Sequence, residues 1–228
     1  MSKNQSERMF RMGDDVLMQK ADSVVESMQR DATDFLTRNV DAARTNEIVT
    51  INNDFKDFPT DQELLGLVTS ATEIKDATAL ELRKQLSAVR SMATTKYGNT
   101  GKFKTFDFGE LSALSNEDLF RTAKRVVRVG TGLLAELASE GLTAAMLANI
   151  ATLATTLDTN IDDMQAAVEI RDIKTQQRVE LANSLWNTLV KYADIGKSLY
   201  EFTDEARFND YVLTDAAGGG ETPVIPTT

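Results

Sequence analysis

Apolar residues recur every three or four positions along most of this chain, which is the spacing of a helix that buries one face. The first such stripe starts after Asp14 and continues for about seven turns, so we expect a first helix over about 14–50. Asn52, Asn53 and Pro59 mark its end. The stripe consists of Leu17, Ala21, Val24, Met28, Ala32, Phe35, Val40 and Ala43.

A second helix is predicted from Thr60 to the Gly98-Asn99 pair. Thr60 and Glu63 have the spacing of a capping box, in which each side chain satisfies an unpaired backbone N–H group. Gly98 is suited to a left-handed helix end. The apolar stripe between them consists of Leu64, Leu67, Val68, Ala71, Ile74, Leu82, Leu86, Val89 and Met92.

The connection over 98–114 is long enough to need packing of its own, and alternating phenylalanines supply it. These are Phe103, Phe106 and Phe108.

Two further helices follow. Ser115 and Asp118 form a capping signal for a third helix, which ends at Gly141. Thr143 caps a fourth helix, and neither proline nor a convincing turn occurs before about Thr203. Unbroken, the fourth helix has about 60 residues and a length of roughly 90 Å at 1.5 Å per residue.

Short connections between helices favour antiparallel neighbours. We therefore predict an all-α fold: an elongated up-down four-helix bundle with a long C-terminal helix and an extended tail. Residues 1–213 are expected to form a single helical bundle domain. Residues 214–228, rich in Gly, Pro and Thr, form the tail. Where the fourth helix extends beyond the third, its apolar stripe needs cover from the other helices or from another subunit.

Composition and charge limit the classes of function that we expect. The chain has no histidine and no cysteine, the two side chains most used for proton transfer near neutral pH, thiolate chemistry and transition-metal ligation. We therefore expect no enzymatic activity and no cofactor. The formal charge of -10 and the pI near 4.6 disfavour binding to nucleic acid, because both partners carry the same sign.

Two stretches deserve comparison with known ligand sites. Asp158, Asn160, Asp162 and Glu169 match oxygen-ligand positions of a calcium loop, but the glycine that its sharp turn needs is Asp163 here. The helical stripe continues through this stretch, so we favour a solvated acidic helix face and predict no metal site. Residues 96–108 interleave lysines with aromatic rings, as single-strand binders do, but the acidic chain argues against that function.

The N-terminal residues 1–12 mix charged and polar side chains and lack the apolar core of a secretory signal. No cleavable Sec signal is apparent, so the cytoplasm, export by a non-Sec route and an assembled particle all stay open. The longest uncharged stretch, 141–157, carries an asparagine and four threonines and is shorter than a usual membrane span. We interpret it as a buried helix and do not expect a membrane partner.

The last quarter of the chain resembles uncharacterised helical-bundle proteins of Bacteroidota bacteria. The resemblance lies in four short motifs and implies a helical fold, with no activity or catalytic residue to transfer. The motifs are Arg171-Asp172-Ile173-x-Thr175, Arg178-x-Glu180-Leu181-Ala182-Asn183, Gly196-Lys197 and Phe208-Asn209-Asp210-Tyr211-Val212.

The leading functional hypothesis is a non-enzymatic structural protein that self-associates through long amphipathic helices into a homo-oligomer, tube or filament. Its expected partner is another copy of itself. The residues expected to carry self-association lie near the C-terminus, where an apolar segment precedes a tail that is either a frayed terminus or a segment that docks in extended form on a neighbour. They are Phe208, Tyr211, Val212, Leu213, Val224 and Ile225.

Two alternatives belong to other classes. One is an α-helical pore-forming or membrane-inserting protein that uses the apolar hairpin 126–157. Glu136 and Glu140 argue against it, because a charge costs several kcal/mol in hydrocarbon. The other is a helical adaptor for a different protein.

Overall fold

The structure, a computed structural model, describes residues 7–213, and residues 1–6 and 214–228 lie outside the described part. Every regular element within 7–213 is a helix, and the long helix α8 (Ala144–Tyr200) packs against several others. The all-α helical bundle predicted from the hydrophobic spacing is therefore confirmed. The predicted tail, 214–228, lies outside the described residues.

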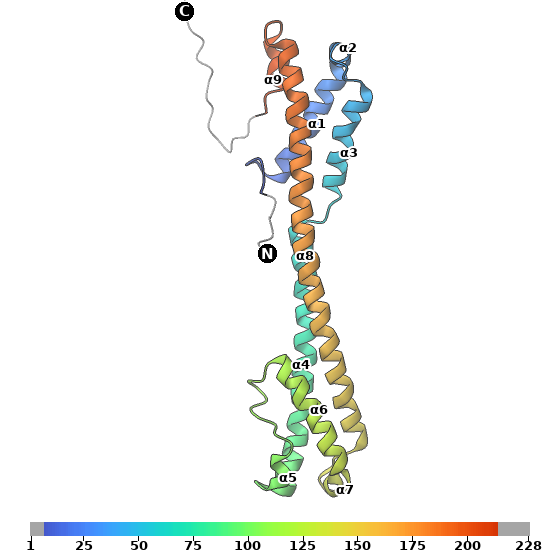
Figure 1. The fold of residues 1–228 in the computed structure, drawn as a ribbon, viewed down its shortest axis with the longest axis vertical. Helices are drawn as coiled ribbons and strands as arrows, with labels where there is room; N and C mark the ends of the chain where they lie inside the picture. Colours follow the sequence, from blue (N-terminus) through green and yellow to red (C-terminus); the bar gives the residue numbers. More distant parts are fainter. Residues whose placement is uncertain (1–6, 214–228) are drawn as a thin grey trace, which may run out of the picture. The chain divides into compact units, whose positions relative to one another are not determined.

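The chain divides into two compact units. Unit 1 combines residues 1–60 with 172–228, and unit 2 spans 61–171. Helix α8 contributes its C-terminal part to unit 1 and its N-terminal part to unit 2 (Figure 1). This division does not decide whether 1–213 unfolds as one cooperative domain, so the single domain stays a prediction.

Unit 1 contains five helical segments around one apolar core. They are α1 (Asp14–Arg30), α2 (Ala32–Leu36), α3 (Ala42–Lys56), the C-terminal part of α8 and α9 (Glu205–Asp210). The core includes Leu17, Met28, Phe35, Ile48, Phe55, Leu185, Leu189 and Tyr192, each at most 1% exposed.

The prediction of one helix over 14–50 is wrong, because the helix is broken twice within this range and its last part, α3, continues through Asn52 and Asn53 to Lys56. Helix α1 ends at Arg30 and α2 is a single five-residue segment. Asn39 then takes a left-handed conformation with φ 58°, and the Asp41 side chain accepts a hydrogen bond from the Arg44 N–H group to cap α3. The apolar spacing survives both breaks because α1, α2 and α3 bury their stripes in the same core.

A segment before α1 also belongs to this core. The backbone N–H of Met9 donates to Oδ1 of Asn183 at 2.9 Å, and Nδ2 of Asn183 donates to the Glu7 carbonyl at 2.8 Å. These bonds hold Phe10 on α8, where its ring centroid lies 5.6 Å from that of Trp186. Trp186 is thus a packing residue of unit 1.

Unit 2 is built on α4 (Asp61–Tyr97), which confirms the second predicted helix. The unit also contains α5 (Gly101–Lys104), α6 (Asn116–Gly132), α7 (Leu134–Leu137), a short 3-10 turn (Ala138–Glu140) and the N-terminal part of α8. Its core includes Ala79, Leu82, Leu86, Val89, Phe106, Leu119, Val126, Leu137, Ile150 and Leu157.

The prediction of one third helix ending at Gly141 is wrong: α6 ends at Gly132, and α7 and the 3-10 turn cover 134–140 as separate short elements. Other sequence signals in unit 2 match the structure. Ser115 caps α6 by accepting from the Asp118 N–H group at 3.1 Å, and Thr143 accepts from the Met146 N–H group at 3.2 Å. Gly141 has φ 96°, which suits glycine. Phe106 and Phe108 are buried and stack with centroids 5.2 Å apart, so the long connection carries its own packing as predicted.

Candidate functional site

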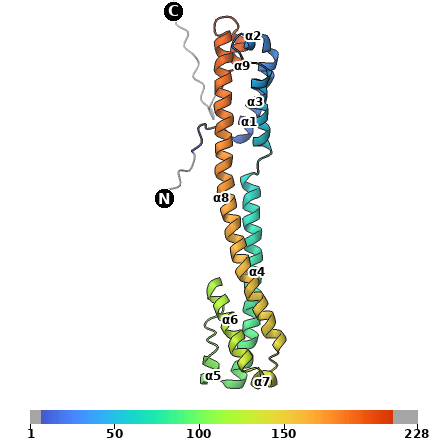
Figure 2. The ribbon, with the colours of Figure 1, turned by 45° about the vertical axis from the view of Figure 1, so that its right-hand side comes forward.

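Part of unit 2 consists of only two helices. Ala79 and Leu157 are the last buried residues where α4, α6 and α8 share a core. Beyond them, residues 65–78 of α4 and 158–171 of α8 lie side by side in both views (Figures 1 and 2). Nδ2 of Asn160 joins them by donating to Oγ1 of Thr78 at 2.9 Å. We call these two stretches the two-helix segment.

The two-helix segment buries none of its residues and leaves large apolar side chains in solvent. On α4, Leu67 is 60% exposed and Ile74 is 56% exposed, and their spacing of seven places them on one face. Leu65 on α4 and Ile170 on α8 are also exposed. Two helices alone cannot enclose a core, so this apolar surface has no cover from the described residues of its own unit.

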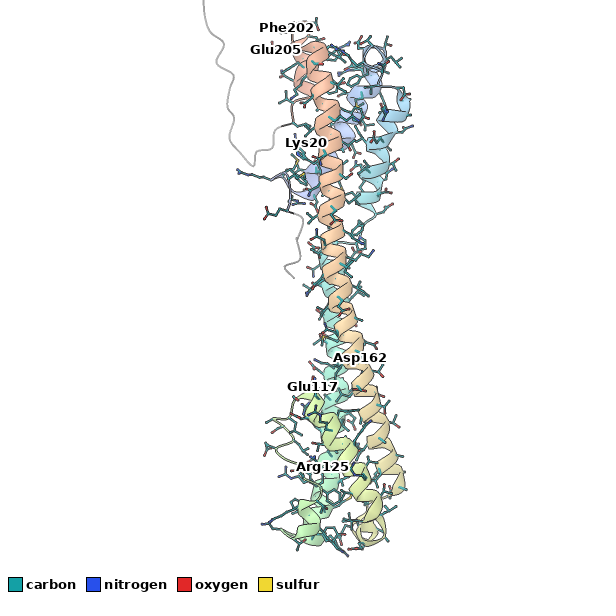
Figure 3. All side chains as sticks on the ribbon, viewed as in Figure 1. Lys20, Glu117, Arg125, Asp162, Phe202 and Glu205 are labelled. Carbon is teal, nitrogen blue, oxygen red and sulfur yellow. The ribbon has the colours of Figure 1, made fainter. Side chains whose placement is uncertain are left out.

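The charges on the two-helix segment are mostly negative. Its carboxylates outnumber its basic side chains by six to two, and Asp162 projects from α8 (Figure 3). A second copy would bring the same acidic surface, so like-charge repulsion would oppose apolar contact between copies.

Four of the six residues predicted to mediate self-association lie within the described part of unit 1, and three of these four pack against its own core. Tyr211 is fully buried, with its ring centroid 5.5 Å from that of Phe35 and 6.2 Å from that of Tyr200. Phe208 and Leu213 are partly buried against the same core. Val212 is 37% exposed. Val224 and Ile225 lie outside the described residues.

A buried carboxylate fixes α9 in place. The Tyr211 hydroxyl donates to Oδ2 of Asp31 at 2.9 Å, and the Arg30 guanidinium donates to both Asp31 oxygens at 2.9 and 2.7 Å. Arg30 also donates to Asp210 at 2.7 Å. Nη1 of Arg207 lies 3.3 Å from Asp31. This cluster, which we call the Asp31 cluster, joins the end of α1 to α9.

The Asp31 cluster shifts the proton affinities of its members. Hydrogen bonds from Arg30 and Tyr211 to its ionised form lower the pKa of Asp31, with the Arg30 bonds as the largest cause. Burial, with the nearby Asp31 carboxylate, raises the pKa of Tyr211. Burial and the hydrogen bond to Asp34 raise the pKa of Tyr200 to about 12. At neutral pH Asp31 is therefore ionised, and Tyr211 and the neighbouring Tyr200 are neutral.

The structure gives ordinary structural contacts to the two stretches that were compared with ligand sites, 158–169 and 96–108. Residues 158–169 lie within the unbroken helix α8 and form no loop. Among the described residues, no group of three or more acidic side chains is placed to hold a metal ion. Lys102 pairs with Glu136 at 2.6 Å and Lys96 with Glu140 at 3.7 Å, so two of the basic side chains in 96–108 bind carboxylates of their own unit.

Lys104 and Arg90 line a hollow of about 250 Å³ beside the phenylalanine connection. Neither side chain has an ion pair within the described residues, and the carboxylate of Asp107 lines the same hollow.

Within residues 7–213, no single helix has the length and apolar composition of a membrane span. Leu134–Glu140 and Ala144–Tyr200 pass that test only as a pair, bent by 104°.

Comparisons of the chain with protein-family models, curated proteins and solved structures find no match.

Proposed function

We propose that this protein is a non-enzymatic structural protein that self-associates, and that the two-helix segment is its principal contact surface. The observation that carries the proposal is the exposure of Leu67 and Ile74 where unit 2 has no third helix. Two such segments brought together would make a four-helix bundle, in which each copy covers the apolar face of the other.

A symmetric contact is the simplest form of this association. In a two-fold dimer the same surface is used by both copies, so one apolar face is enough. Fully burying an aliphatic side chain contributes about 1.5–3 kcal/mol. Each copy in the dimer brings its own set of the exposed residues of the two-helix segment. Repulsion between the acidic side chains reduces this gain but is screened by salt.

Growth into a tube or filament needs a second, different contact. Phe202 is 91% exposed at the turn between α8 and α9, close to Glu205 (Figure 3). The Phe202 ring is a candidate for that second contact, which would be of the head-to-tail kind that generates open polymers.

Sedimentation velocity with two variants tests the proposal. The first replaces both Leu67 and Ile74 by Glu. The control is Leu80→Glu, because Leu80 is on the same helix, is 54% exposed and faces another direction. We expect the wild-type chain to associate and the double variant to weaken association by about 100-fold or more, from two lost apolar contacts. Equal association of all three chains would refute this surface.

A second candidate function, membrane insertion, is favoured by one observation, the bent helix pair described above. Insertion would require Leu137, Leu147 and Ile150 to leave the core of unit 2, where all three are buried. Dye release from anionic and neutral lipid vesicles tests it. Rapid dye release that is equally fast for the wild-type chain and for the Leu67 and Ile74 double variant would favour the membrane function over self-association.

A further inference from the structure

An apolar groove lies in unit 1 where α1, α2 and α3 meet. It has a volume of about 370 Å³, and its floor consists of Met28, Phe35 and Val40, which are 1%, 1% and 5% exposed. Leu36 stands on its edge, 58% exposed. The size is within the range of sites that bind small molecules or short peptide side chains.

The polar edge of the groove is nearly uncharged. Gln29 and Asn46 contribute exposed amides, which can both donate to and accept from a peptide backbone. Asp41 is the one charged residue in the lining, and its carboxylate already caps α3. Such a lining fits an uncharged, extended segment with apolar side chains.

The chain contains one segment of this kind after its last described residue. Residues 222–226 read Thr-Pro-Val-Ile-Pro and carry no charge, and Val224 and Ile225 are the only large apolar residues after Leu213. A proline restricts the residue before it to extended conformations, which here applies to Thr222 and Ile225. The segment therefore loses less conformational entropy than an ordinary peptide when it binds in extended form.

Near the end of the described residues, the chain contacts one residue of the groove floor. Tyr211 packs against Phe35, which is part of the groove floor, and Leu213 packs against the same core. Val224 follows Leu213 by 11 residues, enough for a span of roughly 36 Å at ~3.3 Å per residue. A short tether holds its ligand at an effective concentration of the order of millimolar, which favours the groove of the same molecule over that of another.

We propose that residues 222–226 bind in the α1–α2–α3 groove of their own molecule, with Val224 and Ile225 on Phe35, Leu36 and Val40. The bound segment covers the exposed edge of α2. This inference is independent of association through the two-helix segment, because it concerns unit 1 alone.

Disulfide trapping in the full chain tests the proposal, and the absence of native cysteine makes every cross-link assignable. We pair Ile225→Cys with Asn46→Cys on the groove edge. The matched control pairs it with Asn53→Cys, because Asn53 is the same residue type, exposed, on the same helix and outside the groove. A disulfide needs Cα atoms within about 4.4–6.8 Å, so only a docked segment forms it efficiently.

We expect the Asn46 pair to oxidise within one chain, at least about tenfold faster than the Asn53 pair, the difference that 1.4 kcal/mol of docking free energy produces. Equal rates for the two pairs would overturn the proposal. Chains linked mainly into dimers on a non-reducing denaturing gel would overturn the assignment to the same molecule. Neither result depends on whether the two-helix segment associates.

A second measurement avoids cross-linking. In a chain with the single substitution Leu36→Cys, we expect thiol labelling to speed up about tenfold when Val224 and Ile225 are both replaced by Ser. Labelling of the Asn53→Cys chain should not change with the same replacement. Unchanged labelling at position 36 would contradict docking over Leu36.

Discussion

The ring of Tyr211 packs directly on the backbone of Gly196, so that a β carbon at position 196 would overlap the ring. Gly196 is a buried position within α8, and Tyr211 follows α9. The glycine is therefore present to admit the aromatic ring, and its contact sets how closely α9 approaches α8. Together with the Asp31 cluster, this contact holds the end of unit 1 in place.

Gly196→Ala should destabilise the protein by about 1–3 kcal/mol, the usual cost of overpacking a core, because the ring must move away from α8. Gly66→Ala is the matched control: Gly66 lies within α4, and a β carbon there would meet no atom within 4 Å. That change should stabilise the chain by about 0.5–1 kcal/mol through helix propensity. Urea unfolding followed by circular dichroism measures both. An unchanged free energy of unfolding in Gly196→Ala would show that the Tyr211 ring is free to move away from position 196.

Tyr211→Phe should cost about 1.5–3 kcal/mol, since it removes a buried hydrogen bond to an ionised carboxylate. Tyr97→Phe removes a similar bond, from the Tyr97 hydroxyl to Glu136 at 3.1 Å, but at an exposed site. The loss of unfolding free energy in Tyr97→Phe should therefore be clearly smaller than that in Tyr211→Phe. Free energies of unfolding from urea titration compare the two variants, and equal losses would contradict a special role for the buried bond.

Acid should lower the free energy of unfolding, partly through protonation of Asp31. Its pKa is lower in the folded state, chiefly because of Arg30, so its contribution is complete above the ordinary value of 3.8 and is lost as the pH falls through the lowered value. In Asp31→Asn the free energy of unfolding should be lower at neutral pH and should change less between pH 5 and pH 2, roughly the range over which paired carboxylates titrate. Parallel curves for the two chains would rule out this role of Asp31.

Alkaline titration should find every tyrosine of the folded protein ionising above its ordinary pKa. Burial is the main cause that raises the pKa of all four: Tyr192 and Tyr200 to about 12, and Tyr97 and Tyr211 in the same direction. Since these values lie above 10 in the folded state, the stabilisation is complete below pH 10 and disappears as the pH rises through about 12. Phenolate absorbance should lag behind that of the urea-unfolded chain, and coincident curves would exclude the shifts.

Self-association should strengthen as salt is added. The two-helix segment is acidic on every copy, so repulsion opposes contact at low ionic strength, and screening becomes effective at a Debye length of about 10 Å near 0.1 M salt. Apolar contact itself is not weakened by this change. Sedimentation at increasing sodium chloride concentrations measures the effect. Weaker association at high salt would indicate an ionic contact elsewhere.

The hydrophobic spacing predicted the helices well where no turn interrupts the element. It placed α4 and α8 correctly, because their stripes are continuous and glycines such as Gly196 do not interrupt a packed helix. It missed the turns at Asp31 and Asn39, because three helices bury one continuous stripe and the breaking signals there are single residues. Asn39, a residue tolerant of left-handed conformations, was the available signal.

The candidate site was less predictable than the fold. Leu67 and Ile74 belong to the predicted stripe of the second helix, and spacing alone marks them as core residues. The structure leaves them exposed because α6 does not extend along this part of α4. A stripe identifies a face that needs cover, whereas what covers it depends on the lengths of the neighbouring helices. Likewise, aromatic content drew attention to Tyr211, but its partner Asp31 lies 180 residues away.

Sedimentation equilibrium of the wild-type chain over a wide range of concentrations most directly tests whether this protein associates with itself. We predict a mass that rises with concentration from 25.1 kDa towards at least twice that value, and that the Leu67 and Ile74 double variant keeps near the monomer mass. A single species of 25.1 kDa at every concentration and salt level would contradict the account.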